Sequence, residues 1–272
     1  MYQVNISPQR FHGIVTGSRY DAFHGGIMKK IVCIVFASVL CLNISCKKSD
    51  QDILAEHGDL AKNASVNVSL RKLQEQMKTA KDDAERASIS SSIAEIHIRK
   101  GTVAEAAKAA HIAVKYRPNL YLARYMLGRS YIELGRFQDA VKELVYSIEL
   151  KSDFAPSHFE LGNAFYKQMN YPGAINEYKK AVALDPQHFM AFNNLGVLYS
   201  TAGKSAEAVT FFGKTLSIKS DYAPAHRNLG IVYETKVKDP AKAIHHYQEY
   251  LKLRPNAQDR ALVKTWISLL RG

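Results

Sequence analysis

Glycine recurs at a fixed interval through the second half of the chain. It stands at positions 128, 162, 196 and 230, which are 34 residues apart, and a leucine precedes it each time. An aromatic residue follows each glycine by three positions, as Tyr131, Phe165, Tyr199 and Tyr233. Self-similarity at a period of roughly 20 to 50 residues is typical of repeat proteins, whose neighbouring units stack on one another. The chain is therefore expected to form an array of repeats rather than one globular core.

The same columns predict paired helices. Glycine inside a helix costs about 1 kcal/mol relative to alanine, so a glycine column implies that a neighbouring group lies too close for a Cβ. Alanine follows the first three glycines by twelve positions, and in the last unit it comes one place late, as Ala140, Ala174, Ala208 and Ala243. The large residues beside the glycines share one helical face, and the alanines provide a complementary hollow on a second helix. Each unit is therefore predicted to be two antiparallel helices.

Turn residues mark where these helices end. The prolines of the repeat region fall at predicted helix starts, in turns or after helix ends, where proline is tolerated. Turns within the units are expected near Gly101, Gly135, Met169, Gly203 and Lys238. The segment from Lys236 to Pro240 contains one residue more than the corresponding segments of the other units.

Together, the leucine-glycine, aromatic and alanine columns resemble the tetratricopeptide repeat, which also carries a proline near the end of each unit. The resemblance covers residues 87–257 as five units, 87–120, 121–154, 155–188, 189–222 and 223–257. It implies an all-α fold, a right-handed α-solenoid of helix-turn-helix repeats with flanking capping helices. The departures are local, because the usual tryptophan is absent from the units and Ser152 and Ser220 replace the terminal proline.

A solenoid needs solvated ends, and the sequence predicts a capping helix at each end. The N-terminal one covers residues 68–86, and its apolar positions are Val68, Leu73, Met77 and Ala80. Within it, Asp82 and Glu85 have the spacing of a capping box that opens the first unit. The C-terminal one covers residues 258–272, and its apolar face is predicted to comprise Leu262, Trp266 and Leu269.

Residues 28–45 have the pattern of an export signal. Met28, Lys29 and Lys30 precede a short apolar run over residues 31–42. A membrane-spanning helix needs about 20 apolar residues, and this run is shorter. A cleaved signal peptide is therefore predicted, with an uncleaved anchor as the alternative. Residues 1–27 are polar and aperiodic, which indicates a non-native or mis-annotated extension before a true start at Met28.

The apolar run ends at Ser45 and Cys46 and is followed at once by polar residues. This resembles a bacterial lipoprotein signal, in which a small residue precedes a cysteine that is lipidated and becomes the mature N-terminus. Asn43 stands where that signal usually has leucine. The resemblance implies lipid attachment at Cys46, a flexible tether over residues 46–67 and a place at the bacterial cell envelope. The alternative is that the cysteines are small apolar residues in an apolar run.

In the tetratricopeptide repeat family the first helices line a concave groove that binds extended peptides or partner helices, and the resemblance implies the same use here. The candidate partner-binding residues are Tyr125, Met126, Arg129, Phe159, Asn163, Tyr166, Lys167, Met190, Asn194, Arg227 and Asn228. The aromatic and methionine members are predicted to form one patch of the kind enriched at interface centres. The alternative is that some of them pack between helices.

Asparagine recurs in the predicted groove. Asn194 and Asn228 occupy the same unit position, and Asn163 lies close to it in the preceding unit. An amide side chain can donate to and accept from a peptide backbone at once. The pair resembles two rungs of the asparagine ladder in the peptide-binding repeats of a protein glycosyltransferase, although asparagine is also common at this position of the family.

The net charge of +12 raises the alternative of a polyanion-binding protein. The predicted groove, however, is formally neutral, because four cations meet four glutamates, Arg99, Arg129, Lys167 and Arg227 against Glu95, Glu133, Glu160 and Glu234. No nucleic-acid partner is therefore expected. Contact of Lys47 and Lys48 with anionic lipid headgroups remains an alternative. A hydrophobic fraction of 47% with 23% charged residues excludes wholesale disorder and a multi-span membrane protein.

The sequence contains no motif that indicates a catalytic site. His245 and His246 are adjacent and point to different faces, unlike the i, i+4 spacing that places two histidines on one metal. His158 and His226 replace the tryptophan of the family and are expected to pack. No serine or cysteine has the local setting of a nucleophile. The sequence predicts a membrane-tethered, non-catalytic scaffold with a protein partner and no cofactor, metal or small-molecule substrate. A soluble periplasmic or cytoplasmic adaptor or co-chaperone is the alternative.

Overall fold

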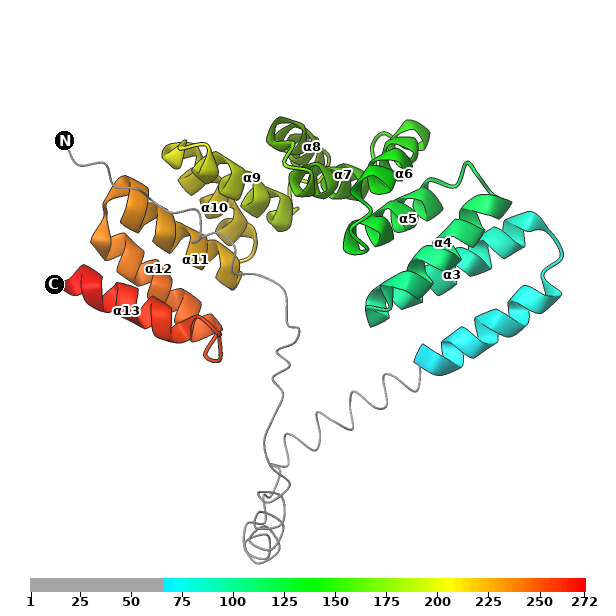
Figure 1. The fold of residues 1–272 in the computed structure, drawn as a ribbon, viewed down its shortest axis with the longest axis horizontal. Coiled ribbons are helices and arrows are strands. Elements are labelled where there is room, and N and C mark those ends of the chain that lie inside the picture. Colours follow the sequence, from blue (N-terminus) through cyan, green and yellow to red (C-terminus); the bar gives the residue numbers. More distant parts are fainter. Residues whose placement is uncertain (1–65) are drawn as a thin grey trace, which may run out of the picture. The chain divides into compact units, whose positions relative to one another are not determined.

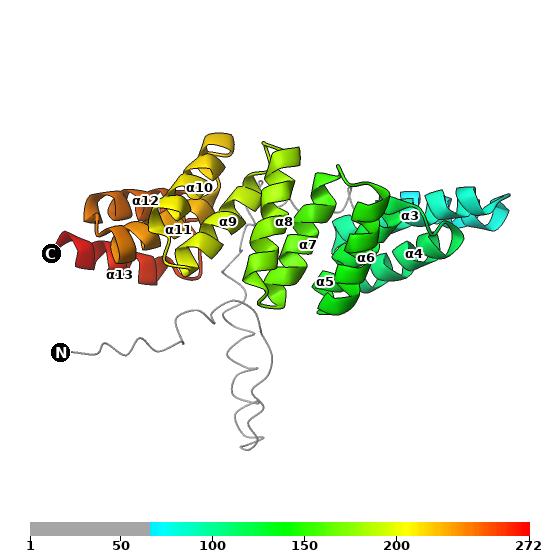
Figure 2. The ribbon, with the colours of Figure 1, turned by 90° about the horizontal axis from the view of Figure 1, so that it is seen from above.

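The computed structural model describes residues 66–272, and the regular elements of this part of the chain are all helices. Helix pairs stack one after another, so the described residues form an all-α solenoid (Figures 1 and 2). The predicted fold class is confirmed. The predicted extension 1–27, the signal peptide 28–45 and the lipid-attachment residue Cys46 lie outside the described residues.

Each pair consists of a first helix, a short turn and a second helix that packs against both its own partner and the next first helix. The pairs are α3 (Asp83–Lys100) with α4 (Val103–Tyr116), α5 (Tyr121–Glu133) with α6 (Phe137–Leu150), α7 (Ala155–Lys167) with α8 (Tyr171–Leu184), α9 (Phe189–Thr201) with α10 (Ser205–Ile218), and α11 (Ala223–Val232) with α12 (Pro240–Leu253). Helix α13 (Arg260–Arg271) packs on α12 and follows the last pair.

Left-handed residues end the first helix of each pair. Between paired helices, φ is positive at Gly101 (71°), Gly135 (74°), Met169 (61°), Gly203 (77°) and Lys238 (61°). These are the positions at which turns are predicted. Met169 and Lys238 adopt this conformation with a Cβ, at a steric cost of about 1–2 kcal/mol each.

The glycine column meets a column of large side chains. A Cβ on Gly128 would lie 2.6 Å from Leu144 Cγ, and a Cβ on Gly162 would lie 2.6 Å from Tyr178 Cε1. The same overlap occurs in the next two units, where the facing residues are Phe212 and Tyr247. All four large side chains are fully buried. The close approach predicted from the glycines is therefore confirmed, and it lies between the two helices of the last four pairs.

The extra residue of the last unit is absorbed by a π-helical turn. Helix α11 continues as the π-helix η2 (Tyr233–Val237) before Lys238 turns the chain into α12. A π turn inserts one residue without ending the helix. This explains why Ala243 and Tyr247 complete their columns one position late.

The N-terminal end differs in part from the prediction. A helix covers residues 66–79, and α3 begins at Asp83, four residues before the predicted start of the first unit at 87. The capping box is present: Asp82 Oδ1 accepts from the Glu85 amide at 2.8 Å, and Glu85 Oε2 accepts from the Lys81 amide at 2.8 Å. The predicted single capping helix 68–86 is therefore two helices, because the cap at Asp82 starts a new one.

The apolar face of the first helix is also shifted. Val68 is 64% exposed, whereas Leu70 is buried. Leu73 and Met77 are partly buried and Ala80 is buried, so positions 70, 73, 77 and 80 form the packed stripe. The helix includes residues 66 and 67, which the sequence assigns to the tether.

The predicted apolar face of α13 is wrong at two of its three positions. Leu262 and Leu269 are 50% and 76% exposed, while Val263 and Ile267 are buried against α12. Trp266 packs as predicted, with 5.4 Å between its ring centroid and that of Tyr247. Residues of α11 and α12 hold the chain just before α13. Asp259 accepts a hydrogen bond from Arg227 Nε at 2.7 Å and another from the Tyr250 hydroxyl at 2.6 Å. The packed residues Val263, Trp266, Ile267 and Leu270 have the spacing of one helical face, so the observed face follows from the sequence of α13 itself.

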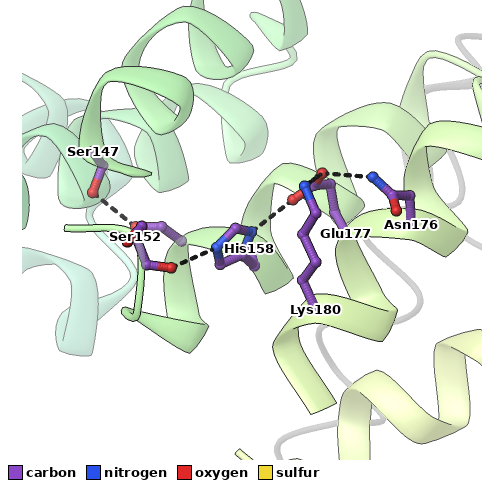
Figure 3. Close-up of polar contacts among 7 residues, drawn as sticks. Ser147, Ser152, His158, Asn176, Glu177 and Lys180 are labelled. Atoms are coloured by element: carbon purple, nitrogen blue, oxygen red, sulfur yellow. Dashed lines mark hydrogen bonds and ion pairs between the residues drawn. The ribbon is translucent and has the colours of Figure 1, made fainter. Parts of the chain in front are cut away.

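One slot between the helices of a pair is filled by different chemistry in each of the last four units. Its occupants are Arg124 with Glu143, His158 with Glu177, Phe192 with Phe211, and His226 with His246. His158 Nδ1 lies 2.7 Å from Glu177 Oε2, and its Nε2 lies 3.0 Å from the Ser152 carbonyl oxygen (Figure 3). His158 and His226 are both buried, so they are packing residues as expected.

Candidate partner-binding groove

The first helices form a face that runs from unit to unit. Successive first helices touch one another directly, α3 with α5, α5 with α7 and α9 with α11. Hydrogen bonds link this face further, since Asn194 Nδ2 donates to Asn163 Oδ1 at 3.2 Å and Asn228 Nδ2 donates to Asn193 Oδ1 at 3.3 Å. We call this surface, formed by α5, α7, α9 and α11, the groove face.

A pocket of about 300 Å³ opens on the groove face. Its lining comes from three consecutive first helices and from one second helix, and consists of Ile132, Glu133, Glu160, Asn163, Tyr166, Lys167, Tyr178, Asn194 and Val197. Four of these, Asn163, Tyr166, Lys167 and Asn194, are among the candidate residues from the sequence. The structure therefore brings together the middle of the predicted site.

The amides form a directional chain of hydrogen bonds that ends on a carboxylate. Asn228 donates to Asn193, whose Nδ2 donates to Asn194 Oδ1 at 3.4 Å. Asn194 donates to Asn163, and Asn163 Nδ2 donates to Glu160 Oε2 at 2.9 Å. Chains of this kind polarise each member, so each bond strengthens the next. The asparagines are thus held in fixed orientations across three units.

Glu160 ends this chain in a desolvated position. Its side chain is only 13% exposed, and its nearest cation is Arg129, whose Nε lies 3.8 Å from Oε1. Burial raises the pKa of the Glu160 carboxyl above its ordinary value, and the nearby Glu133 adds to that rise; the Asn163 hydrogen bond and Arg129 oppose it. The charge of Glu160 is therefore poorly compensated in the free protein.

Two of the predicted surface residues are core residues. Met126 is 3% exposed and packs with Ala107 and Ala110 of the preceding pair. Phe159 is 9% exposed, and its ring centroid lies 4.4 Å from that of His188. The predicted aromatic and methionine patch is therefore wrong at these positions, because both side chains fill the space between neighbouring helix pairs.

The other candidates are spread along the face. Tyr166 and Met190 are 39% and 41% exposed, whereas Tyr125 is partly buried against Phe154, with 5.3 Å between ring centroids. Arg129 borders the pocket through Glu160, and Asn228 joins the amide chain. Arg227 is held by Asp259 in the clamp before α13, which gives it a structural role.

Six residues that line the pocket or join the amide chain were not among the partner-binding candidates: Ile132, Glu133, Glu160, Tyr178, Asn193 and Val197. Glu160 occupies the same unit position as Asn194 and Asn228, and the sequence places it in the groove only as one of the glutamates that balance the groove's charge. Tyr178 belongs to a second helix, and its hydroxyl reaches the groove face across the glycine column. That contact has no signal in the sequence.

Over residues 66–272, no helix is both long and apolar enough to cross a membrane. In the same part of the chain, no cluster of three or more His, Cys, Asp or Glu side chains is arranged to hold a metal ion.

Comparison with known proteins identifies the repeats. Residues 128–168 and 170–203 match a family described as TPR repeat, and residues 190–219 match one described as tetratricopeptide repeat. No curated protein sequence matches the chain.

Solved structures with the same fold include a MamA protein, at 25% identity over 65% of this chain and 95% of that one, with a TM-score of 0.54. They also include YrrB, described as a TPR protein with an unusual peptide-binding site, at 18% identity over 71% and 97%, with a TM-score of 0.55. Pseudomonas aeruginosa pilF matches at 18% identity over 70% and 92%, with a TM-score of 0.58. Tetratricopeptide repeats are therefore present over residues 128–219 of this chain, and the solved structures share the fold of the array.

Proposed function

We propose that the protein is a non-catalytic scaffold whose groove face binds an extended segment of a partner protein. The observation that carries this proposal is the amide chain from Asn228 to Glu160, which lies beside a pocket lined by α5, α7 and α9. Proteins with such repeats are generally scaffolds without catalytic activity. A partner segment that follows the first helices would meet oriented amides in successive units.

Pre-orientation favours binding because little side-chain entropy is lost when the partner arrives. Asn163 and Asn194 are partly exposed, so they are accessible from the groove face while their internal hydrogen bonds hold them. Asn194 Nδ2 carries two N–H groups, and one is used toward Asn163. The second can donate to a backbone carbonyl of the partner.

Photocrosslinking in cells tests this proposal. The photoreactive residue benzoylphenylalanine replaces Tyr166 on the groove face in one variant and Tyr146 on the second helix α6 in the other. Both tyrosines are exposed, at 39% and 53%. We expect a crosslinked partner from position 166 and none from position 146. Crosslinking from position 146 alone would place the interface on the second helices and refute the proposal.

We further propose that the protein is attached to a membrane of the bacterial cell envelope through a lipid on Cys46. The support is the sequence, in which a basic start, a short apolar run and Ser45 precede Cys46. Labelling with a clickable fatty acid tests it, because Cys46→Ser should abolish the label, whereas Cys41→Ser should leave it unchanged. A label that survives Cys46→Ser would contradict the proposal.

A further inference from the structure

Several polar groups of the pocket on the groove face are already paired internally. The Tyr178 hydroxyl and Asn194 both donate to Asn163 Oδ1, and Asn163 donates to Glu160 Oε2. The second N–H of Asn194 stays available to the partner backbone. Among the described residues, Glu160 Oε1 receives no hydrogen bond, since Arg129 Nε at 3.8 Å is beyond hydrogen-bond range. The pocket therefore contains a carboxylate oxygen that can still accept a hydrogen bond.

A second carboxylate lines the same pocket. Glu133 is exposed, and within residues 66–272 it forms no ion pair. Its charge is close enough to raise the pKa of the Glu160 carboxyl. Two carboxylates that face one cavity repel each other, and a cation between them would relieve both the repulsion and the desolvation of Glu160.

The cations near the pocket compensate these carboxylates only in part. Arg129 pairs with Glu160 at 3.8 Å through a side chain that is 42% exposed. Lys167 lines the pocket but is exposed, and within residues 66–272 it forms no ion pair. Long exposed side chains of this kind reorient at little cost. An anionic ligand in the pocket would approach the Glu160 carboxylate, which is buried and held in place by Asn163. The two negative charges would repel each other.

The walls suit an aliphatic stem. Ile132 and Val197 supply apolar surface, and Tyr166 supplies an aromatic ring. Lysine and arginine bury their methylene stems against such surfaces and place the charged head on a carboxylate or a ring.

From these contacts we infer that the pocket binds the side chain of a lysine or arginine residue in the partner segment, with Glu160 and Glu133 as its counter-charges. This inference rests on the proposed function, since it assigns one residue of the segment that the groove face binds. It specifies the chemistry of the partner segment. The partner residue that enters the pocket, between α5 and α9, must be basic.

Selection from a phage-displayed random peptide library on the full-length chain tests the inference. We expect lysine or arginine to be enriched at one position of the selected peptides. In fluorescence anisotropy, replacing that residue with norleucine should weaken binding about tenfold, the effect of one charge-assisted hydrogen bond. Glu160→Gln should weaken the original peptide by a similar factor and leave the norleucine peptide nearly unchanged.

Glu149→Gln is the matched control, because Glu149 is exposed on α6 and its loss changes the net charge equally. It should leave both affinities unchanged. Peptides that bind without a basic residue, or with equal affinity to the Glu160→Gln variant, would overturn this inference and leave the proposed function standing. Recovery of no binding peptide would count against both.

Discussion

Tyr178 performs two roles, because its ring fills the space beside Gly162 while its hydroxyl donates a 2.7 Å hydrogen bond to Asn163 Oδ1. The first contact fixes the distance between α7 and α8, and the second orients the amide at the centre of the groove face. Tyr247 does the same in the last unit, where its hydroxyl donates to Glu234 Oε2 at 2.6 Å. Repeat packing and site geometry therefore depend on the same side chain.

Tyr178→Phe separates these roles. Phe212 occupies the equivalent position in the next unit, so a phenyl ring is expected to fit. We expect a loss of about 1 kcal/mol in the free energy of unfolding, the contribution of one hydrogen bond. Binding of the selected peptide should weaken as well, because Asn163 loses its anchor. Urea unfolding and anisotropy measure the two effects; unchanged binding would show that Asn163 does not depend on this contact.

The glycine column predicts opposite effects for two alanine substitutions. A Cβ on Gly196 would lie 2.6 Å from the ring of Phe212, which is fully buried. Gly196→Ala should therefore destabilise the protein, by about 1–3 kcal/mol as overpacking does. Gly213 is also helical but has no neighbouring atom within 4 Å of the added Cβ. Gly213→Ala should stabilise by about 1 kcal/mol. Thermal unfolding of both variants is the measurement, and a shift of the same sign in both would contradict this account.

The contribution of the buried His158 and Glu177 pair to stability can be tested by replacing it with the apolar pair that the next unit uses. His158→Phe leaves Glu177 Oε2 without its buried donor, which should cost about 2 kcal/mol or more. Adding Glu177→Phe reproduces the apolar pair Phe192 and Phe211 of the next unit and should recover most of that loss. Chemical denaturation of the single and double variants checks the prediction. A double variant less stable than the single one would show that the slot is not interchangeable between units.

The last unit should be sensitive to acid. Burial, with the charges of His226 and His245, lowers the pKa of His246 to about 4, against the opposing effect of Glu249. The unfolded chain takes up this proton below its ordinary pKa of about 6.5, whereas the folded chain does not until about 4. Stability should therefore fall as the pH drops through this window.

Comparing the urea midpoints near pH 7 and near pH 5 measures this effect. His246→Phe should narrow the difference between the two conditions, and His111→Phe, at an exposed position on α4, should not. If both variants reduced the difference in urea midpoint equally, His246 would be excluded as the source of the acid sensitivity.

Much of the fold can be read from the sequence because its signals are local and steric. The glycines predict the close approach within the last four pairs, and five turn residues, Met169 and Lys238 included, predict every left-handed position between paired helices. The capping box at Asp82 is equally local.

The rest depends on contacts between units. Met126 and Phe159 occupy groove positions of the repeat but are drawn into the space between pairs, where their size fills the core. The chain that leads into α13 is held by Arg227 and Tyr250, which both donate to Asp259 from other helices. The burial of Glu160, which decides the character of the pocket, likewise depends on neighbours from α5 and α9.

The most direct test of the central claim is the side-chain amide NMR spectrum of the protein as the selected peptide is added. Asn163, Asn194 and Asn228 report on the groove face, and Asn176, exposed on α8, is the internal control. We predict that the amide signals of the first three shift together and saturate with one dissociation constant, while those of Asn176 stay in place. Shifts confined to Asn176 and other second-helix residues would contradict binding at the groove face.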